Sequence, residues 1–318
     1  MSEKEAFEIL FDNDFVDRYE TDQAKAVDVI IPLINTNPMF EKSLINFYKR
    51  IPINRLIIGD SGCTDDSIEI VKKFPRVIVF DHTSFKSLGY RIKLLIESCE
   101  TEFFIYLHAD VFLPENWFDI MYSRRLEHNW YECGRKNISV VLWDSKAQEL
   151  AERAYSGSQF GNTGKLKEAV SAVEDDYLYR NEDIVISELM NKDNYMKYSD
   201  TYHYHQFQRR KGEEEPSLIV TAKVSRAKDV QWEIDAFEMQ WRGIVKYCEP
   251  KPYLRENVKG AIRVLILNNA FNAKEAKKWI QETNPKWNPY LWKRTRPNLW
   301  ARKIYVKLRQ RMRRILRK

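Results

Sequence analysis

The sequence has few of the residues that mark linkers, disulfide frameworks or membrane spans. Only 10 of its 318 residues are glycine and 11 are proline, which leaves little room for low-complexity linkers. No apolar run approaches the roughly 18–20 residues that a membrane-spanning helix needs. The first 22 residues are acidic and mixed, so we expect no signal peptide there. These absences exclude a disordered, collagenous or multi-span membrane protein.

The four cysteines are scattered along the sequence. Cys63, Cys99, Cys133 and Cys248 include no CxxC pair or other spacing typical of metal ligands. We expect reduced thiols in a cytosolic protein. With 44% apolar residues, the chain can bury a full core without disulfides.

Acidic residues are missing from the end of the chain, and this makes the net charge of +6 misleading. The segment 286–318 holds 13 lysines and arginines and no acid, which leaves 39 basic and 46 acidic residues elsewhere. The chain is therefore a mildly acidic body, of charge −7, with a strongly basic tail.

Apolar runs alternate with helical patterns in the first third of the chain. We expect strands at 27–33, 55–59, 76–80 and 103–107, and helices at 41–50, 65–74 and 87–98, with a further helix starting at Pro114. This alternation predicts an α/β fold with a mostly parallel sheet and helices on both faces.

The pattern loosens further along. We expect strands at 138–143 and 197–205, a helix at 183–191, and loops at 156–164, which is rich in glycine, and at 208–215, which is charged. Beyond Pro216 the chain has a mostly helical pattern.

Polar side chains follow several of the predicted strands. Asn35 follows the first strand, Asp60 the second and His108-Ala109-Asp110 the fourth, and Glu182-Asp183 begins a later helix. Ligands of open α/β sheets bind beyond the carboxyl ends of the strands. The carboxylates and the histidine therefore indicate a site for a metal-bound ligand that carries phosphate.

Four segments in order resemble the family 2 glycosyltransferases of the GT-A fold. They read VDVIIPLIN at 27–35, IIGDSGCTDDS at 57–67, FFIYLHADVFLP at 103–114 and RNEDIVISEL at 180–189. The resemblance covers about 25–210. It implies a GT-A fold and an enzyme that transfers a sugar from a nucleotide-diphospho-sugar. The nucleotide of this donor is expected to be UDP or GDP.

The resemblance also implies roles for residues at the strand ends. Asp60 matches the aspartate that reads the base, and Asp110 matches the last acid of the Asp-x-Asp motif, which binds a divalent metal, Mn²⁺ or Mg²⁺. Residues expected to contact the nucleotide-sugar are Pro32, Asn35, Asp60, Lys93, His108 and Ala109.

The sequence departs from the family pattern at two places. His108 stands where the motif has its first acid, which weakens the expectation that this position touches the metal and leaves the ribose or a phosphate as its contact. The family's Arg-Asn pair is replaced by Ile92-Lys93, so Arg91 or Lys93 is expected to supply the cation toward phosphate.

The remaining site residues come from the later segments. Asp183 matches the catalytic base of a Glu-Asp pair, which takes the acceptor's proton in an inverting transfer, and Glu182 is expected to orient the acceptor. His203 and His205 lie two apart on a predicted strand and therefore face the same side. Family members often carry a histidine there, so both are candidate metal ligands.

The tail has the pattern of a basic amphipathic helix. Trp300, Ile304, Leu308, Met312 and Leu316 recur every four residues among nine lysines and arginines. We expect it to dock on an anionic membrane surface. The alternatives are packing on its own domain and binding of nucleic acid.

We expect four regions: an extension at 1–24, the GT-A domain at 25–215, a helical region at 216–285 and the tail at 286–318. The predicted function is sugar transfer to a glycan or lipid-linked acceptor at the cytoplasmic membrane face, without a nucleic-acid partner. The rivals are a nucleotidyltransferase, which would need a glycine-rich loop after the first strand, and a non-catalytic binding protein, which only His108 favours.

Overall fold

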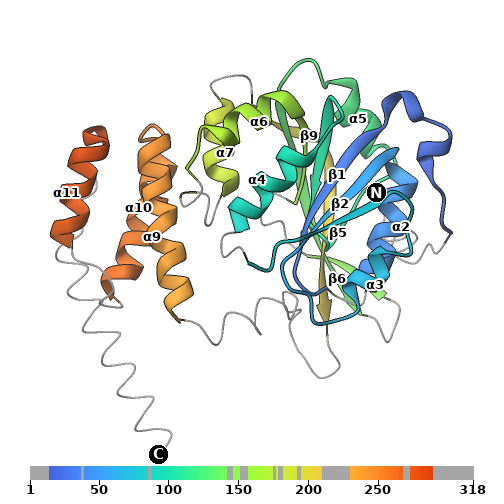
Figure 1. Ribbon diagram of the computed structural model, residues 1–318, viewed down its shortest axis with the longest axis horizontal. Coiled ribbons are helices and arrows are strands. Elements are labelled where there is room, and N and C mark those ends of the chain that lie inside the picture. The colour runs from blue at the N-terminus through green and yellow to red at the C-terminus, as the bar shows by residue number, and fades with distance from the viewer. Residues whose placement is uncertain are drawn as a thin grey trace, which may run out of the picture. The chain divides into compact units, whose positions relative to one another are not determined.

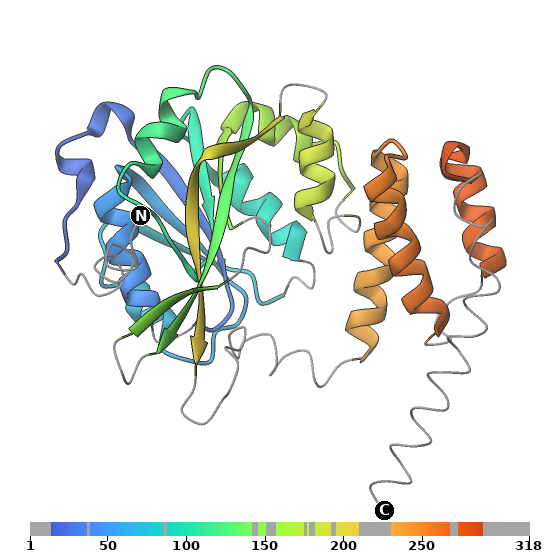
Figure 2. The same ribbon diagram turned by 180° about the vertical axis from the view of Figure 1, so that it is seen from behind.

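The structure is a computed structural model that describes residues 14–36, 39–84, 88–141, 146–150, 157–174, 177, 182–191, 195–209, 230–267 and 273–288. The chain divides into two compact units (Figures 1 and 2). The first comprises Met1–Ala172 and Ile186–Lys228, and the second comprises Val173–Val185 and Asp229–Lys318. Each unit is described by itself.

The first unit is built on a nine-stranded sheet of order β3-β2-β1-β4-β8-β6-β9-β5, with β7 paired to β6. The strands are β1 Val27–Leu33, β2 Ile53–Asp60, β3 Val77–Asp81, β4 Phe103–Leu107, β5 Val111–Phe112, β6 Trp130–Val141, β7 Lys146–Leu150, β8 Ser158–Asn162 and β9 Tyr195–Arg209. Short 3₁₀ turns at Arg18–Glu20 and Gln23–Lys25 precede β1.

The half formed by β3, β2, β1 and β4 is entirely parallel, as the sequence predicts. The crossover helices are α2 Phe40–Arg50, α3 Ser67–Val71 and α4 Leu88–Ser98. Figures 1 and 2 show α2 and α3 on one face of the sheet, and α4 on the other with α6, Thr163–Ser171. Successive side chains of β1 point to opposite faces of the sheet. Because helices cover both faces, nearly all of these side chains are buried. The prediction of an α/β fold is confirmed.

The other half of the sheet mixes directions. Strand β8 runs antiparallel to β4 and β6, β6 runs parallel to β9, and β9 runs antiparallel to β5. Helix α5, Trp117–Ser123, also belongs to this unit. Helix α7, Glu182–Asn191, belongs to the second unit up to Val185 and to the first from Ile186. The parallel arrangement expected for most of the sheet therefore ends at β4.

The glycine-rich segment is a strand rather than the predicted loop. Within 156–164, β8 pairs with β4 and β6 in the middle of the sheet. A Cβ on Gly161 would lie 2.7 Å from the Trp130 ring, so only a glycine fits against that indole. Glycine and asparagine are poor strand formers, and here packing overrides their propensity.

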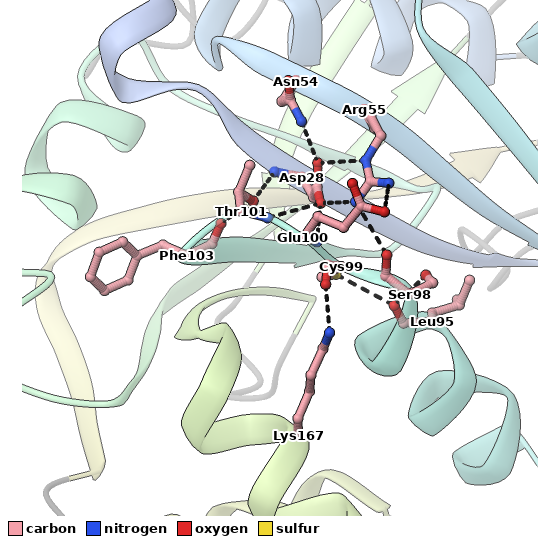
Figure 3. Close-up of polar contacts among 10 residues, drawn as sticks. All are labelled: Asp28, Asn54, Arg55, Leu95, Ser98, Cys99, Glu100, Thr101, Phe103 and Lys167. Carbon is pink, nitrogen blue, oxygen red and sulfur yellow. Dashed lines mark hydrogen bonds and ion pairs between the residues drawn. The ribbon is translucent and has the colours of Figure 1, made fainter.

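A buried carboxylate joins three parallel strands at the edge of the sheet where they begin (Figure 3). Asp28 on β1 is fully buried and accepts hydrogen bonds from Asn54 and Arg55 of β2. It also accepts backbone N–H bonds from Glu100, at 2.7 Å, and Thr101, just before β4. This buried acid is thus fully paired, as buried charges must be.

The second unit contains α9 Val230–Tyr247, α10 Pro252–Leu267 and α11 Ala273–Thr283, followed by a 3₁₀ turn at Pro285–Trp287. Trp241 and Trp279 meet edge to face, and the buried Trp287 donates its indole N–H to Cys248 O. Of the helices that the structure describes, none is both long and apolar enough to cross a bilayer. The amphipathic helix predicted at 300–316 lies outside the described residues.

Candidate functional site

Three polar segments meet at the edge of the sheet where β1, β2 and β4 end. Because these strands are parallel neighbours, their carboxyl ends share one edge. Asn35 follows β1, Asp60 ends β2 and His108 follows β4. The loops are joined here, since Ser61 N donates to Leu33 O at 2.8 Å. The structure thus places these predicted site residues on a common edge.

Asn35 and Asp60 shape the two loops on this edge. Asn35 has a φ of 45°, in the left-handed region that asparagine tolerates. Its Oδ1 accepts the Thr64 N–H at 2.7 Å. Asp60 accepts the N–H groups of Gly62 and Cys63, both on Oδ1. A carboxylate has two oxygens, so forming this turn is compatible with contacting a ligand.

A second group of side chains gathers at the end of β4. The ligand atoms of His108, Asp110 and His205 lie within 4.8 Å of one another. Nε2 of His205 is 3.1 Å from Oδ2 of Asp110. The antiparallel pairing of β5 with β9, which sets Val111 opposite His205, brings these distant segments together.

The protonation states of this group suit a metal. Burial alone would raise the pKa of Asp110, but the neighbouring His205, His108 and Arg135 lower it to about 2. Burial lowers the pKa of His108 to about 4. At neutral pH Asp110 is therefore charged and His108 is neutral, which are the forms that bind metal ions.

One atom of the group lacks a partner that a metal would supply. Asp110 Oδ1 is buried and has no hydrogen-bond partner among the described residues. Leaving a buried charged oxygen unpaired is costly. The donor set of one carboxylate and two imidazoles fits a divalent ion, so the residues present fit the metal that the family resemblance implies.

His203, the other predicted ligand on β9, lies outside this group. Its ring is fully buried, and Nδ1 lies 2.9 Å from Ser158 Oγ and 3.2 Å from Cys133 Sγ. A Cβ on Gly157 would lie 2.8 Å from His203 Nε2. Its ring therefore packs against the backbone segment whose Gly157 O accepts the N–H of His108.

Two neighbours of the group were not expected from the sequence. Arg135 on β6 interacts electrostatically with Asp110, which opposes the lowering of the arginine's pKa by burial. Tyr106 OH lies 3.2 Å from His108 Nε2. Arg135 lies in a strand without a motif, so only the pairing of β6 with β9 could reveal it.

The cation expected on α4 has two candidates. Lys93 Nζ lies 6.0 Å from the Tyr90 ring centroid. Arg91 interacts with His82, whose pKa is lowered by burial and by the positive charge of this arginine. His82 in turn donates its backbone N–H to Asp60 O. Arg91 thus has an electrostatic link, through His82, to the strand-end edge.

The remaining predicted site residues are located by the strand, loop or helix in which they lie. Pro32 pairs in register with Gly59 on β2, and Ala109 packs against the main core. Glu182 and Asp183 form the first turn of α7, and their side chains lie outside the described residues.

A hollow of about 520 Å³ near Thr101 and Lys167 lies at the other edge of the sheet, where β4 begins. It is therefore separate from the strand-end edge that holds the candidate site.

Comparisons with known proteins agree with this architecture. The family model described as glycosyl transferase family 2 matches residues 28–157. A crystal structure of S. aureus TarS 1–349 in complex with UDP-GlcNAc is similar with a TM-score of 0.54, 14% identity and 86% of each chain covered. The structure of that fragment without a named ligand has a TM-score of 0.52, with the same identity and coverage. At this identity the likeness shows a shared fold. No curated protein matches the chain.

The matched segment contains the ends of β1, β2 and β4 and the residues Asn35, Asp60 and Asp110. Residues 28–157 therefore have the sequence pattern of the family 2 glycosyltransferases, and the fold is the GT-A fold. Together these findings support a glycosyltransferase.

Proposed function

We propose that the protein is an inverting, metal-dependent enzyme that transfers a sugar from a nucleotide-diphospho-sugar of UDP or GDP. The observation that carries this proposal is the group of His108, Asp110 and His205 on the same sheet edge as Asn35 and Asp60. The edge combines a candidate metal site with an acid suited to contact a base.

The proposed roles combine the family resemblance with the position of these residues at the strand ends. Asp60 accepts the ring N–H of the base, and Pro32, Asn35 and Ala109 line the nucleotide side. Asp110 and His205 hold the metal, which when bound neutralises charge on the leaving diphosphate. Arg91 or Lys93 on α4 adds positive charge.

The acceptor side is assigned to α7. Asp183 takes the proton of the acceptor hydroxyl as it attacks the anomeric carbon, and Glu182 orients the acceptor. Their position in the first turn of a helix also suits a structural role, since the helix dipole favours acids there. A variant that retains size but not basicity separates the two roles.

The acceptor itself is proposed to be a glycan or a lipid-linked molecule at the cytoplasmic face of a membrane. The support for this acceptor is the basic amphipathic pattern of the tail. We propose that the chain has four regions, bounded at 1–24, 25–215, 216–285 and 286–318, of which the last is this tail. The acidic body would not by itself favour an anionic surface.

The test is a screen of the full chain against UDP-, GDP-, CMP- and dTDP-sugars with Mn²⁺ or Mg²⁺. UDP-GlcNAc, which the similar TarS structure holds, is the first donor to try. We expect one donor to raise the melting temperature only with metal, and to release its nucleoside diphosphate in the presence of acceptor. Full activity in excess EDTA, or release of pyrophosphate, would contradict the proposal.

A matched pair of variants strengthens the screen. Asp110→Ala should abolish metal-dependent binding of the nucleoside diphosphate. Asp119→Ala removes a half-exposed acid on α5 whose surface ion pair with Arg18 contributes about 1 kcal/mol or less. This control should bind the nucleoside diphosphate and turn over the donor as the wild type does.

A further inference from the structure

The metal site contains a residue that the family resemblance does not assign to it. His108 stands in place of the first acid of the motif, where contact with ribose or phosphate was expected. In the structure, one of its ring nitrogens belongs to the same ligand group as Asp110 and His205. We infer that His108 is a direct metal ligand and that the site therefore selects transition-metal ions such as Mn²⁺ and Co²⁺ over Mg²⁺. This inference rests on the metal site of the proposed function.

His108 is held in place from its backbone and its ring. Its N–H donates to Gly157 O at 2.9 Å, which joins the end of β4 to β8. Tyr106 OH lies 3.2 Å from Nε2, and the two ring centroids are 5.4 Å apart. An imidazole has two nitrogens, so one can pair with Tyr106 while the other binds a metal. A hydrogen bond of this kind is the usual way in which a metal-bound histidine is oriented.

The three ligands approach from two directions. His108 and Asp110 lie two residues apart after β4, while His205 comes from β9, the strand paired with β5. Three protein ligands would leave coordination positions on a bound ion open for diphosphate oxygens. A site of this kind has the donor set of two histidines and one carboxylate that binds iron and related ions with open positions.

The chemistry of the donors decides the preference. Mg²⁺ prefers oxygen ligands, demands near-octahedral geometry and loses its waters reluctantly. Imidazole nitrogen suits the first-row transition metals, whose affinity rises from Mn²⁺ to Cu²⁺. Replacing the motif's first acid by His108 exchanges an oxygen donor for a nitrogen, and it also leaves one carboxylate rather than two. Both changes lower the affinity of the site for Mg²⁺ relative to the transition metals.

The first experiment measures metal binding to the full wild-type chain without any nucleotide. Bound Mn²⁺ is followed by electron paramagnetic resonance while Mg²⁺ is added. We expect displacement to need an excess of Mg²⁺ of about 100-fold. The electron spin echo of bound Mn²⁺ should show modulation from two directly coordinated nitrogens. Displacement at similar concentrations, or an echo without nitrogen modulation, would overturn the inference.

Substitution then tests His108 itself. His108→Asp restores the family's acid and should narrow the preference for Mn²⁺ over Mg²⁺ by about tenfold, with the loss of one nitrogen from the echo. His128→Asn removes an imidazole from the turn before β6, where its ring contacts Tyr131, and should change neither measurement. Unchanged nitrogen modulation in a folded His108→Asp variant would show that His108 is no ligand.

The outcomes separate this inference from the proposed function. Turnover of a nucleotide-sugar by a protein that binds Mn²⁺ and Mg²⁺ equally would reject the inference alone. Selective binding of Mn²⁺ through two nitrogens, without turnover of any donor, would support the inference and reject the proposed function. If the variant does not fold, the wild-type competition and echo still decide.

Discussion

Nε2 of His205 lies 3.1 Å from Oδ2 of Asp110, although Asp110 lies between β4 and β5 and His205 lies on β9, the last strand of the sheet in the sequence. The contact exists because β9 returns to pair with the two-residue strand β5. A metal bound here would therefore depend on both the strand-end loop and the last strand of the sheet.

Asp183→Asn tests the proposed base. Asparagine keeps the size and hydrogen bonding of the side chain but cannot accept the proton, so we expect turnover to fall by about 10²–10⁴-fold. Affinity for the donor, measured by calorimetry, should barely change. Glu168→Gln on α6, an exposed acid paired with Lys165, is the control and should retain turnover. If Asp183→Asn kept more than about a third of the activity, another group would be the base.

Asp60→Asn tests recognition of the base. Asparagine can still form the turn by accepting the N–H groups of Gly62 and Cys63 with Oδ1. The amide would then present N–H groups where the base also has an N–H, so affinity for the nucleoside diphosphate should fall by about 10–100-fold. The melting temperature should change little. Asp81→Asn, which alters the corresponding turn with Thr83 after β3, should leave nucleotide affinity intact, and equal effects of the two changes would reject the role.

Gly157→Ala tests the packing of His203. The new Cβ would lie 2.8 Å from His203 Nε2 and must displace that buried ring or the segment that holds His108. We expect destabilisation of about 1–3 kcal/mol, as in overpacked cores, and weaker binding of Mn²⁺. Gly260→Ala is the control, because nothing lies within 4 Å of a Cβ there. That helical site should instead gain up to about 1 kcal/mol. Unchanged thermal unfolding of Gly157→Ala would show that the His203 ring is free to move.

Asp28→Asn tests the buried carboxylate of Figure 3. Burial alone would raise the pKa of Asp28, but hydrogen bonds from Arg55, Glu100 N–H and Asn54 hold this pKa below the ordinary value of an aspartate. A lowered pKa contributes stability that is present above about pH 4 and is lost as the pH falls through the folded-state pKa.

We expect Asp28→Asn to cost about 3 kcal/mol at pH 7, since it leaves Arg55 without its buried partner. The difference from wild type, measured by urea unfolding, should shrink as the pH is lowered below 4. A difference that stays constant down to pH 2 would show that the charge of Asp28 does not stabilise the fold.

Deletion of Leu299–Lys318 tests the tail. It removes nine cations and the whole apolar stripe, so binding to vesicles that contain anionic lipid should fall sharply. Binding of the full chain should weaken with salt, because exposed charges are screened within about 10 Å at 0.1 M. Turnover on a short water-soluble acceptor should survive. Replacing Leu308 and Met312 by serine keeps the charge of the tail but interrupts its apolar stripe. Vesicle binding by this variant therefore measures the contribution of the apolar residues apart from that of the charges. Equal sedimentation of the truncated and full chains with vesicles, or unfolding on deletion, would reject membrane docking.

The parallel half of the fold could be predicted because its strands are buried on both faces. Val27–Leu33 and Phe103–Leu107 are continuous apolar runs, and the structure places β1 and β4 at these bounds. The antiparallel half gave weaker signals. Strand β8 pairs across the centre of the sheet through Gly161 against Trp130, a fit between two residues that no local pattern reports.

The candidate site was predictable in part for a similar reason. Asn35, Asp60 and Asp110 stand out because each directly follows or ends an apolar run, and parallel strands bring such ends together. Arg135 has no such marker, since it reaches Asp110 only through the pairing of β6 with β9. The separate surroundings of His203 and His205 likewise depend on Ser158 of β8 and on Asp110, which lies just before β5.

The pairing of β9 with both β6 and β5 also bears on synthesis of the protein. As the chain emerges from the ribosome, β1 to β4 can pair early because their contacts are close in sequence. Asp110 meets His205 only after residue 209 has been made and β9 has closed against strands synthesised long before it. An ion that requires both residues would ignore chains that end before β9, so metal uptake would report that the sheet has been closed by its last strand.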